Sequence, residues 1–422
     1  MLVVSPCSTL IITVNIKNVT RNVCCYSFIE RIFVSFIFIH KGLRDCQCMT
    51  INILSTYWHY DNQDNYTVYK KELNMIDLHF TRTNGAADKT IDELLDLVGD
   101  ISHPEIVREM ILSALKAGQE NNDRAHMKLM NATMKEMRFT GKIFSPYSHI
   151  RKVTVFGSAR TEKSEPIYEI AYNFGKRLVE SGYMVITGGG PGIMQAANEG
   201  AGPEHSFGAN IQLPFEQKPN PVLIGNPRLI TYKYFFNRKV AFLKEADAVA
   251  LFPGGFGTLD EAMETLTLLQ TGKHDPLPLV LVDEPGGTYW SRWLKFLKEE
   301  LMSPDYIDDY DFNLFECVDS LDDAVSKINY FYSRYHSLRY VNGQLVMRLN
   351  SGIDPLSVER LNEKFRSILN PNGKIYMSDP LPAEYDEPDL MEKPRLLVDF
   401  NNRDFGRLRG LINDINGCKN AN

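Results

Sequence analysis

Between residues 151 and 335 the chain alternates short apolar runs with longer segments whose apolar positions recur at helical spacing. A short apolar run bounded by turn residues is typical of a buried strand, and recurrence at i, i+3 and i+4 is typical of a helix with one buried face. The predicted strands are 152–156, 183–187, 208–213, 228–232, 248–252 and 279–282. The predicted helices are 166–181, 193–199, 236–245, 259–266, 289–301 and 321–335. This alternation predicts an α/β fold, a Rossmann-like doubly wound parallel sheet with helices on both faces.

The segments on either side of this unit have different patterns. A helical extension is predicted before it, and its last helix carries a methionine stripe for which we expect core packing: Met127, Met130, Met134 and Met137. A small C-terminal α+β tail is predicted after it, with a hairpin about Asn342-Gly343, a helix over 355–369, a loop over 379–394, a strand over 395–400 and a helix over 404–415. The predicted domains are a disordered or dispensable leader over 1–75, the helical extension over 76–150, the α/β domain over 151–335 and the tail over 336–422.

Composition and charge limit the classes of protein that remain. Hydrophobic residues make up 44% and charged residues 23% of the chain, which is usual for a soluble globular protein. The net charge of −7 argues against a surface devoted to nucleic acid. The most apolar stretch, 28–39, is too short to span a bilayer, so no membrane segment is expected. Only two of the seven cysteines lie beyond residue 48, and none has zinc-ligand spacing, so we expect a cytoplasmic protein with no metal and no disulfide framework.

Three glycine-bearing turns follow predicted strands, and the carboxyl ends of parallel strands lie at one edge of their sheet. The turns are Gly157-Ser158, Gly188-Gly189-Gly190 and Pro253-Gly254-Gly255-Phe256-Gly257-Thr258. Glycine permits a tight turn and a close approach of the backbone to a ligand. The third turn opens a helix, with Thr258 as the expected N-cap, and the free N–H groups of a helix N-terminus bind phosphate. Glu261 would lie about one turn into that helix, near the ligand.

Two structural alternatives apply to this third turn. A glycine-rich turn can serve packing alone. The spacing of Thr258 and Glu261 also fits a capping box, in which the Glu261 carboxylate accepts a hydrogen bond from the Thr258 backbone N–H.

The helix before the third turn carries Arg238 and Lys239. Arg238 shares a helix face with Phe235 and Phe242, at i−3 and i+4. An arginine on an aromatic face either extends to solvent or reaches into a cleft. No turn has the Gly-x-Gly-x-x-Gly order of a dinucleotide site, and no Gly-Lys-Ser/Thr of a P-loop is present. A mononucleotide or sugar-phosphate site is what remains.

These motifs together resemble the LOG family. The resemblance covers about 151–335 and includes the glycine triple with Gly192 and Met194, the Asn237-Arg238-Lys239 helix and the loop from Pro253 to Glu261. Members of that family are phosphoribohydrolases that cleave cytokinin riboside 5′-monophosphates or AMP into the free base and ribose 5-phosphate. The resemblance implies that Arg238 and Glu261 are required for activity. It also implies that the loop holds the phosphate and that the protein is a homodimer or higher homo-oligomer.

The expected reaction is hydrolysis of the N-glycosidic bond of a nucleoside 5′-monophosphate, with no cofactor. Glu261 would stabilise the oxocarbenium-like state and activate water, and Arg238 would orient the phosphate or ribose or stabilise the departing base. The expected phosphate- and substrate-binding residues are Gly157, Ser158, Gly188, Gly189, Gly190, Lys239, Gly254, Gly255, Gly257 and Thr258.

Other functions fit the same loops. One is a nucleotide-binding regulatory or carrier protein that does not cleave its ligand, and another is phosphoribosyl transfer to an acceptor other than water. Many LOG relatives are labelled lysine decarboxylases, but that reaction needs a pyridoxal-phosphate lysine with its supporting groups, and the sequence shows no such site.

Overall fold

The computed structural model describes residues 80, 82–214 and 218–420. The predicted leader, 1–75, lies outside the described residues. The chain divides into two compact units, Met1–Leu115 and Lys116–Asn422. The described part of the first unit contains α3 (Ala86–Val98) and most of α4 (Pro104–Glu120), which crosses the boundary. A buried ion pair between Arg108 and Asp88 joins these two helices.

Helix α5 (Arg124–Phe144) opens the second unit and packs on it through its C-terminal half. The Thr140 hydroxyl lies 2.7 Å from the Tyr232 hydroxyl, and the Phe144 ring stacks on Phe207 with a centroid distance of 4.4 Å. Met137 packs against the core, but Met130 and Met134 in the N-terminal half are 40% and 44% exposed. Core packing was therefore the wrong prediction for those two methionines, because only the end of α5 lies against the sheet.

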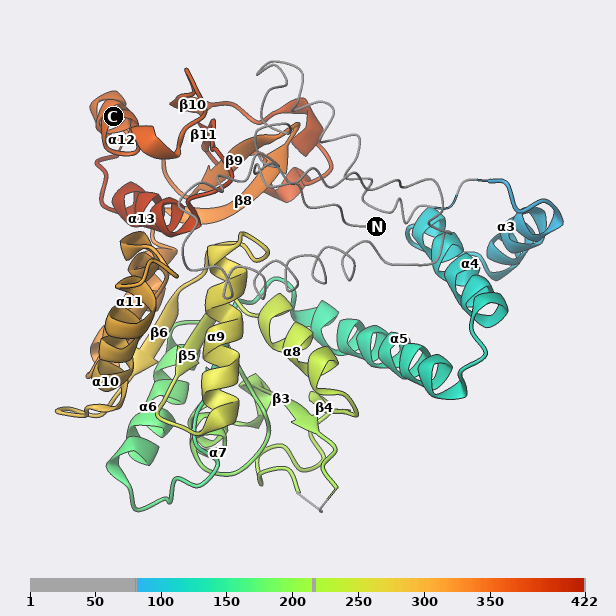
Figure 1. The fold of residues 1–422 in the computed structure, drawn as a ribbon, viewed down its shortest axis with the longest axis horizontal. Coiled ribbons are helices and arrows are strands. Elements are labelled where there is room, and N and C mark those ends of the chain that lie inside the picture. Colours follow the sequence, from blue (N-terminus) through green and yellow to red (C-terminus); the bar gives the residue numbers. More distant parts are fainter. Residues whose placement is uncertain (1–79, 81, 215–217, 421–422) are drawn as a thin grey trace, which may run out of the picture. The chain divides into compact units, whose positions relative to one another are not determined.

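Seven parallel strands form the main sheet, in the order β4-β3-β2-β1-β5-β6-β7 (Figure 1). They are β1 (Lys152–Phe156), β2 (Met184–Thr187), β3 (Ser206–Ile211), β4 (Leu229–Tyr232), β5 (Ala248–Leu251), β6 (Leu279–Val282) and β7 (Glu316–Val318). The chain moves outward from β1 to β4 and then returns to the other side of β1 with β5. The strand order therefore reverses between β1 and β5, where an open α/β sheet forms its ligand crevice.

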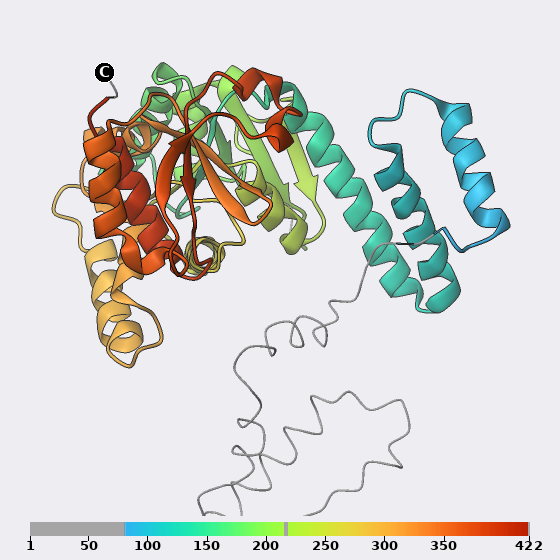
Figure 2. The same cartoon turned by 90° about the horizontal axis from the view of Figure 1, so that it is seen from above.

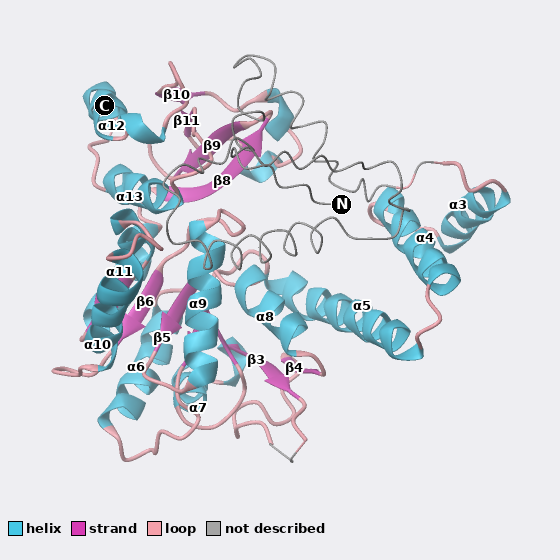
Figure 3. Cartoon of the chain, in the orientation of Figure 1, coloured by secondary structure: helices cyan, strands magenta, loops and turns pink. Residues whose placement is uncertain are grey.

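Helices cover both faces of this sheet, and the alternation of strands and helices can be followed in Figure 3. One face packs against α6 (Pro166–Glu180), α7 (Ile193–Ala201) and α11 (Leu321–Phe331). The other packs against α8 (Phe235–Lys244), α9 (Phe256–Gln270) and α10 (Tyr289–Phe296), which continues into a π-helical turn, Leu297–Met302. Burial of the central strands on both faces explains why the sequences of β5 and β6 are continuous apolar runs. The predicted doubly wound α/β fold is confirmed.

The C-terminal part forms a second sheet, antiparallel, in the order β10-β11-β9-β8. Its elements are β8 (Tyr335–Val341), β9 (Gln344–Leu349), α12 (Pro355–Lys364), β10 (Ile375–Ser378), β11 (Arg395–Val398) and α13 (Phe405–Asn416). Asn342 and Gly343 both have positive φ, 50° and 82°, as a two-residue hairpin turn of type I′ requires. The predicted hairpin and α+β tail are confirmed. Helices α12 and α13 lie side by side on the core of this sheet (Figure 2).

The predicted loop over 379–394 contains two single-turn 3₁₀ helices, Pro382–Glu384 and Pro388–Leu390. Its Glu384 carboxylate is fully buried and accepts hydrogen bonds from Arg348 on β9 and Arg395 on β11. A buried carboxylate needs such partners to offset its lost hydration. None of the described helices is long and apolar enough to cross a membrane.

Candidate active site

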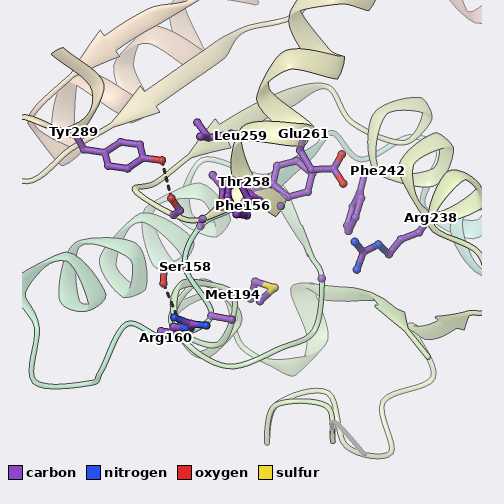
Figure 4. A pocket seen from close by; sticks show the side chains of 17 residues that line it. Phe156, Ser158, Arg160, Met194, Arg238, Phe242, Thr258, Leu259, Glu261 and Tyr289 are labelled. Atoms are coloured by element: carbon purple, nitrogen blue, oxygen red, sulfur yellow. Dashed lines mark hydrogen bonds between the residues drawn. The ribbon is translucent and has the colours of Figure 1, made fainter. Parts of the chain in front are cut away.

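A cavity of about 880 Å³ lies at the carboxyl edge of the main sheet, where β1 and β5 are neighbours. The turns after β1, β2 and β5 all contribute to its wall. Of the residues expected to form the site, the cavity is lined by Gly157, Ser158, Gly188, Arg238, Gly254, Gly255, Gly257, Thr258 and Glu261. Figure 4 shows that Glu261 and Arg238 project toward the same space from α9 and α8.

The glycine loop after β5 leads directly into α9. The helix begins at Phe256, with Gly255 as its N-cap, so Thr258 is the third helical residue. The prediction of Thr258 as the N-cap was wrong, because the helix begins earlier than the threonine suggests. The Thr258 side chain packs instead on Gly254, where a Cβ would overlap the threonine hydroxyl. Gly254 is therefore required by the local packing.

Gly255 and Gly257 have no such packing requirement. A Cβ on either would meet no atom within 4 Å, and neither has a positive φ. At Gly257, in the first turn of α9, glycine is less stable than alanine by up to about 1 kcal/mol. At the N-cap position of Gly255 glycine is tolerated well, but Ser, Thr, Asn or Asp would also satisfy the cap. Packing alone therefore does not account for these two glycines, and their bare backbone leaves space for a ligand.

The same loop presents free backbone donors. Within the described part of the chain, the N–H groups of Gly254, Gly255, Phe256 and Gly257 have no hydrogen-bond acceptor. The Thr258 N–H donates to the Gly255 carbonyl at 3.1 Å. Free N–H groups at the positive end of the α9 dipole form a site suited to a phosphate.

Glu261 is buried beside this donor group, with 3% of its surface exposed. Burial raises its pKa to about 7, against the opposing attraction of Lys239 and Arg238. Its Oε2 atom has no hydrogen-bond partner among the described residues. No side-chain cap forms at the α9 N-terminus, so the capping-box alternative for Glu261 is not what the structure shows. A carboxyl group that is half-ionised near neutral pH can both give and take a proton.

Arg238 lies between two aromatic rings on the cavity wall. The centre of its guanidinium is 4.8 Å from the Phe235 ring centroid and 5.3 Å from that of Phe242. Burial lowers the pKa of Arg238, opposed by the negative charges of Glu261 and Asp260. Its Nε–H is buried and has no acceptor among the described residues. Of the two alternatives for Arg238, the structure shows the side chain in the cleft.

Lys239 lies outside the cavity wall, although it follows Arg238 directly. Its ammonium group is 2.5 Å from Glu264, 2.9 Å from Asp260 and 3.9 Å from Glu261. Consecutive helical residues point about 100° apart, and on α8 Arg238 faces the cavity while Lys239 faces the acidic side chains of α9. The structure thus places Lys239 behind Glu261, where its positive charge lowers the pKa of that carboxyl group.

Gly189 and Gly190 also lie away from the cavity wall. The Gly189 N–H donates to the Thr187 hydroxyl at 3.0 Å. The buried Asn220 donates to both glycine carbonyls, through its backbone N–H to Gly189 at 2.8 Å and through its side chain to Gly190 at 3.2 Å. These contacts fix the conformation of the second turn outside the cavity, while Gly188 contributes to the cavity wall.

The cavity also contains residues that were not among the expected catalytic and binding residues. Arg160 and Tyr289 add polar groups, and the apolar part of the wall is Phe156, Met194, Phe242, Phe256 and Leu259. Arg160 follows the Gly157-Ser158 turn by two residues, which could have indicated it. Tyr289 is the first residue of α10, which follows β6, and no local pattern connects it to the glycine turns. Among the described residues, no group of three His, Cys, Asp or Glu side chains is placed to hold a metal ion.

Comparison with known proteins supports the resemblance seen in the motifs. Residues 192–328 match the family model described as "Possible lysine decarboxylase". The chain is 29% identical over 163 residues to the cytokinin riboside 5′-monophosphate phosphoribohydrolase LOG3 of Arabidopsis thaliana, covering 37% of this chain and 74% of that protein. It is 34% identical over 143 residues to the corresponding LOG of Oryza sativa subsp. japonica, covering 32% and 57%. The match to the probable phosphoribohydrolase LOGL6 of the same rice covers 64% of that relative at 28% identity.

Solved structures with a similar arrangement include TM1055, at 25% identity and a TM-score of 0.32 over 43% of this chain and 99% of that one. The molybdenum cofactor carrier protein of Chlamydomonas reinhardtii is 18% identical with a TM-score of 0.30, over 43% of this chain and 96% of that one. The resemblance of residues 151–335 to the LOG family, expected from the motifs, is confirmed by the sequence matches.

Proposed function

We propose, from this resemblance and the geometry of the cavity, that the protein hydrolyses the N-glycosidic bond of nucleoside 5′-monophosphates. The products would be the free base and ribose 5-phosphate. The observation that carries the proposal is the pairing of Glu261 and Arg238. Both have a buried polar atom that makes no hydrogen bond to any described residue, and both line one cavity together with the free N–H groups of α9. Buried polar groups without partners are rare in folded proteins and are expected at sites that receive a ligand.

In this proposal the 5′-phosphate binds to the N–H groups of Gly255 and Gly257 at the start of α9. The ribose then lies along the loop, and its anomeric carbon lies close to Glu261. The bond from C1′ to the base nitrogen breaks with its electron pair leaving on the base. The ionised Glu261 stabilises the positive charge that develops on the ribose.

Water completes the reaction. Glu261 accepts a proton from the attacking water as the water oxygen bonds to C1′. That proton then passes to the departing base, so the Glu261 carboxylate is regenerated. Arg238 stabilises the negative charge that the base carries before it is protonated. The wall formed by Phe156, Met194 and Phe242 offers an apolar surface for a purine ring. AMP and cytokinin riboside 5′-monophosphates are therefore the substrates proposed first.

The test is release of the free base from a panel of nucleoside 5′-monophosphates, followed by chromatography with the full chain. We expect at least one purine monophosphate to yield base and ribose 5-phosphate, while its unphosphorylated nucleoside does not react. Binding of monophosphates without any base release would contradict hydrolysis and favour a nucleotide carrier. Product that forms only when an acceptor is added would indicate phosphoribosyl transfer instead.

We also propose that two copies of the chain associate through exposed apolar residues near the cavity. On α8, Phe236 and Val240 are 47% and 48% exposed and share a helix face. The neighbouring α5 and α9 add Met134 and Met263. Apolar side chains gathered on adjacent helices are typical of a protein interface.

Replacing Val240 with glutamate should convert a dimer into a monomer, because the new charge would be desolvated at the contact. Sedimentation velocity at micromolar concentration measures the change. The matched control is Leu356→Glu on α12, which is more exposed and lies in the C-terminal part of the chain. A wild-type chain that sediments as a monomer, or an unchanged Val240→Glu variant, would contradict the proposed interface.

A further inference from the structure

Tyr289 makes one hydrogen bond to the glycine loop. Its hydroxyl donates to the carbonyl oxygen of Gly254 at 2.7 Å, as the dashed line in Figure 4 shows. This carbonyl belongs to the peptide that joins Gly254 to Gly255, and the described chain has no cis peptide bonds. In a trans peptide the C=O and the N–H point in opposite directions. Holding the Gly254 carbonyl toward Tyr289 therefore turns the Gly255 N–H away from Tyr289.

The direction of that N–H matters because Tyr289 and the Glu261–Arg238 pair line different parts of the cavity wall, to which Gly254 and Gly255 also contribute. In Figure 4, Tyr289 is at one side of the view, and Glu261 and Arg238 are at the opposite side. The Gly255 N–H has no acceptor among the described residues. Because Gly255 has no Cβ, its peptide can rotate easily when nothing holds it. Without the tyrosine, the N–H would spend part of its time pointing elsewhere.

Tyr289 is itself held firmly at the start of α10. Asp283, at the end of β6, accepts hydrogen bonds from the backbone N–H groups of Tyr289 at 3.0 Å and Trp290 at 3.3 Å. The Tyr289 ring meets the buried Trp290 ring edge-on, with a centroid distance of 4.8 Å. The Trp290 indole N–H donates to the Val282 carbonyl at 3.1 Å. Contacts at the start of α10 therefore fix the position of the Tyr289 hydroxyl. This segment is separate in the sequence from the glycine loop to which the hydroxyl donates.

We infer that Tyr289 is a positioning residue of the phosphate site, whose hydroxyl fixes the Gly254–Gly255 peptide so that the Gly255 N–H faces the ligand. The inference rests on the proposed function for the identity of that ligand, a phosphate group. Tyr289 acts through the loop and not on the reacting atoms. Its contribution therefore belongs to phosphate binding, and the cleavage step itself depends on Glu261 and Arg238.

Tyr289→Phe tests the inference, because phenylalanine keeps the ring contact with Trp290 and removes only the hydroxyl. The probe is inorganic phosphate, with its Kd measured by titration calorimetry on the full chain, followed by AMP and adenosine. We expect the Kd for phosphate and for AMP to rise about fivefold, the net contribution of one hydrogen bond. Adenosine has no phosphate, so its binding should not change. If AMP is cleaved, KM should rise while kcat stays within about twofold.

Tyr332→Phe is the matched control. The Tyr332 hydroxyl also donates to a backbone carbonyl, that of Asp247 at 2.6 Å, beside the opposite end of β5. The two variants should lose similar small amounts of stability, but only Tyr289→Phe should weaken phosphate binding. An equal Kd for phosphate in the two variants, or a Tyr289→Phe variant that lowers kcat and leaves KM unchanged, would overturn the inference.

The outcomes separate this inference from the proposed reaction. If the wild type binds phosphate and AMP without cleaving AMP, hydrolysis fails as the function, while the effect of Tyr289→Phe on the Kd still decides the inference. If the wild type cleaves AMP and Tyr289→Phe binds phosphate normally, the inference fails and the function stands. A wild type that binds neither phosphate nor AMP overturns both.

Discussion

Replacing Glu261 with glutamine will reduce base release by about 10²–10⁴-fold while monophosphate binding is retained. Glutamine has the shape of glutamate but cannot take a proton from water or carry the negative charge that the oxocarbenium-like state requires. Turnover and calorimetric binding are measured side by side on the same protein. A variant that loses binding and turnover together would assign Glu261 to substrate binding, and one that keeps its turnover would contradict a catalytic role.

The same substitution has an expected effect on stability that depends on pH. The pKa of Glu261 is about 7 in the folded chain and 4.5 in the unfolded reference, so the folded state binds the proton more tightly. Glu261 therefore costs no stability below about pH 4.5, and the folded state is progressively destabilised as pH rises toward 7. Glutamine mimics the protonated form at every pH. The variant should exceed the wild type in free energy of unfolding by roughly 3 kcal/mol at pH 8.5, and should match it near pH 4.5. Urea unfolding at both pH values checks this, and a difference that is the same at both would contradict the buried, high-pKa state of Glu261.

Replacing Arg238 with methionine will lower kcat/KM by about 10²–10³-fold, the usual effect of removing one preorganised group from a reaction site. The methionine still fills the space between Phe235 and Phe242, so the loss reflects the missing charge. The pKa of Glu261 should also rise, because Arg238 is one of the two cations that lower it. The rate should then reach its maximum at a higher pH than in the wild type. Arg238→Lys should restore only part of the rate, because a lysine lacks the planar guanidinium.

Lys239→Met is the control for this charge effect. Lys239 also lowers the pKa of Glu261, but its side chain lies outside the cavity wall. The Lys239 variant should shift the pH–rate profile in the same direction while its rate at the new optimum stays close to that of the wild type. An equal loss of maximal rate in both variants would contradict the distinct role proposed for Arg238.

The fold could be predicted where local patterns and burial agree. The central strands β5 and β6 are buried on both faces and appear in the sequence as continuous apolar runs. The edge strands β7 and β10 were not predicted, because Glu316–Val318 has three residues and Ile375–Ser378 is partly exposed, so neither leaves an apolar pattern. Each of these two edge strands forms by pairing with a neighbouring strand, β6 or β11, that lies elsewhere in the sequence.

The site could be predicted only in part, for related reasons. The glycine turns and the Arg238–Glu261 pair are encoded in short motifs, and the topology of a parallel sheet brings those motifs to one edge. The position of Lys239 outside the cavity depends on which face of α8 is turned toward α9, and the motif alone does not specify that face. The start of α9 at Phe256 and the contact of Tyr289 with Gly254 depend on packing between separate loops. Contacts of this kind produce no recognisable pattern in the local sequence.

The strand order of the main sheet also has a consequence for how the chain folds during synthesis. Strand β1 is made first but lies at the centre, and its partner β5 follows only after about a hundred residues, a separation that makes such a pairing slow. Until β5 emerges from the ribosome, one side of β1 has no neighbour, and that edge presents unpaired backbone N–H and C=O groups. The wall of the cavity includes residues from the turn after β1 through Tyr289. The chain therefore cannot bind a ligand in this cavity until β5, α9 and the start of α10 have been made and have joined the strands already present.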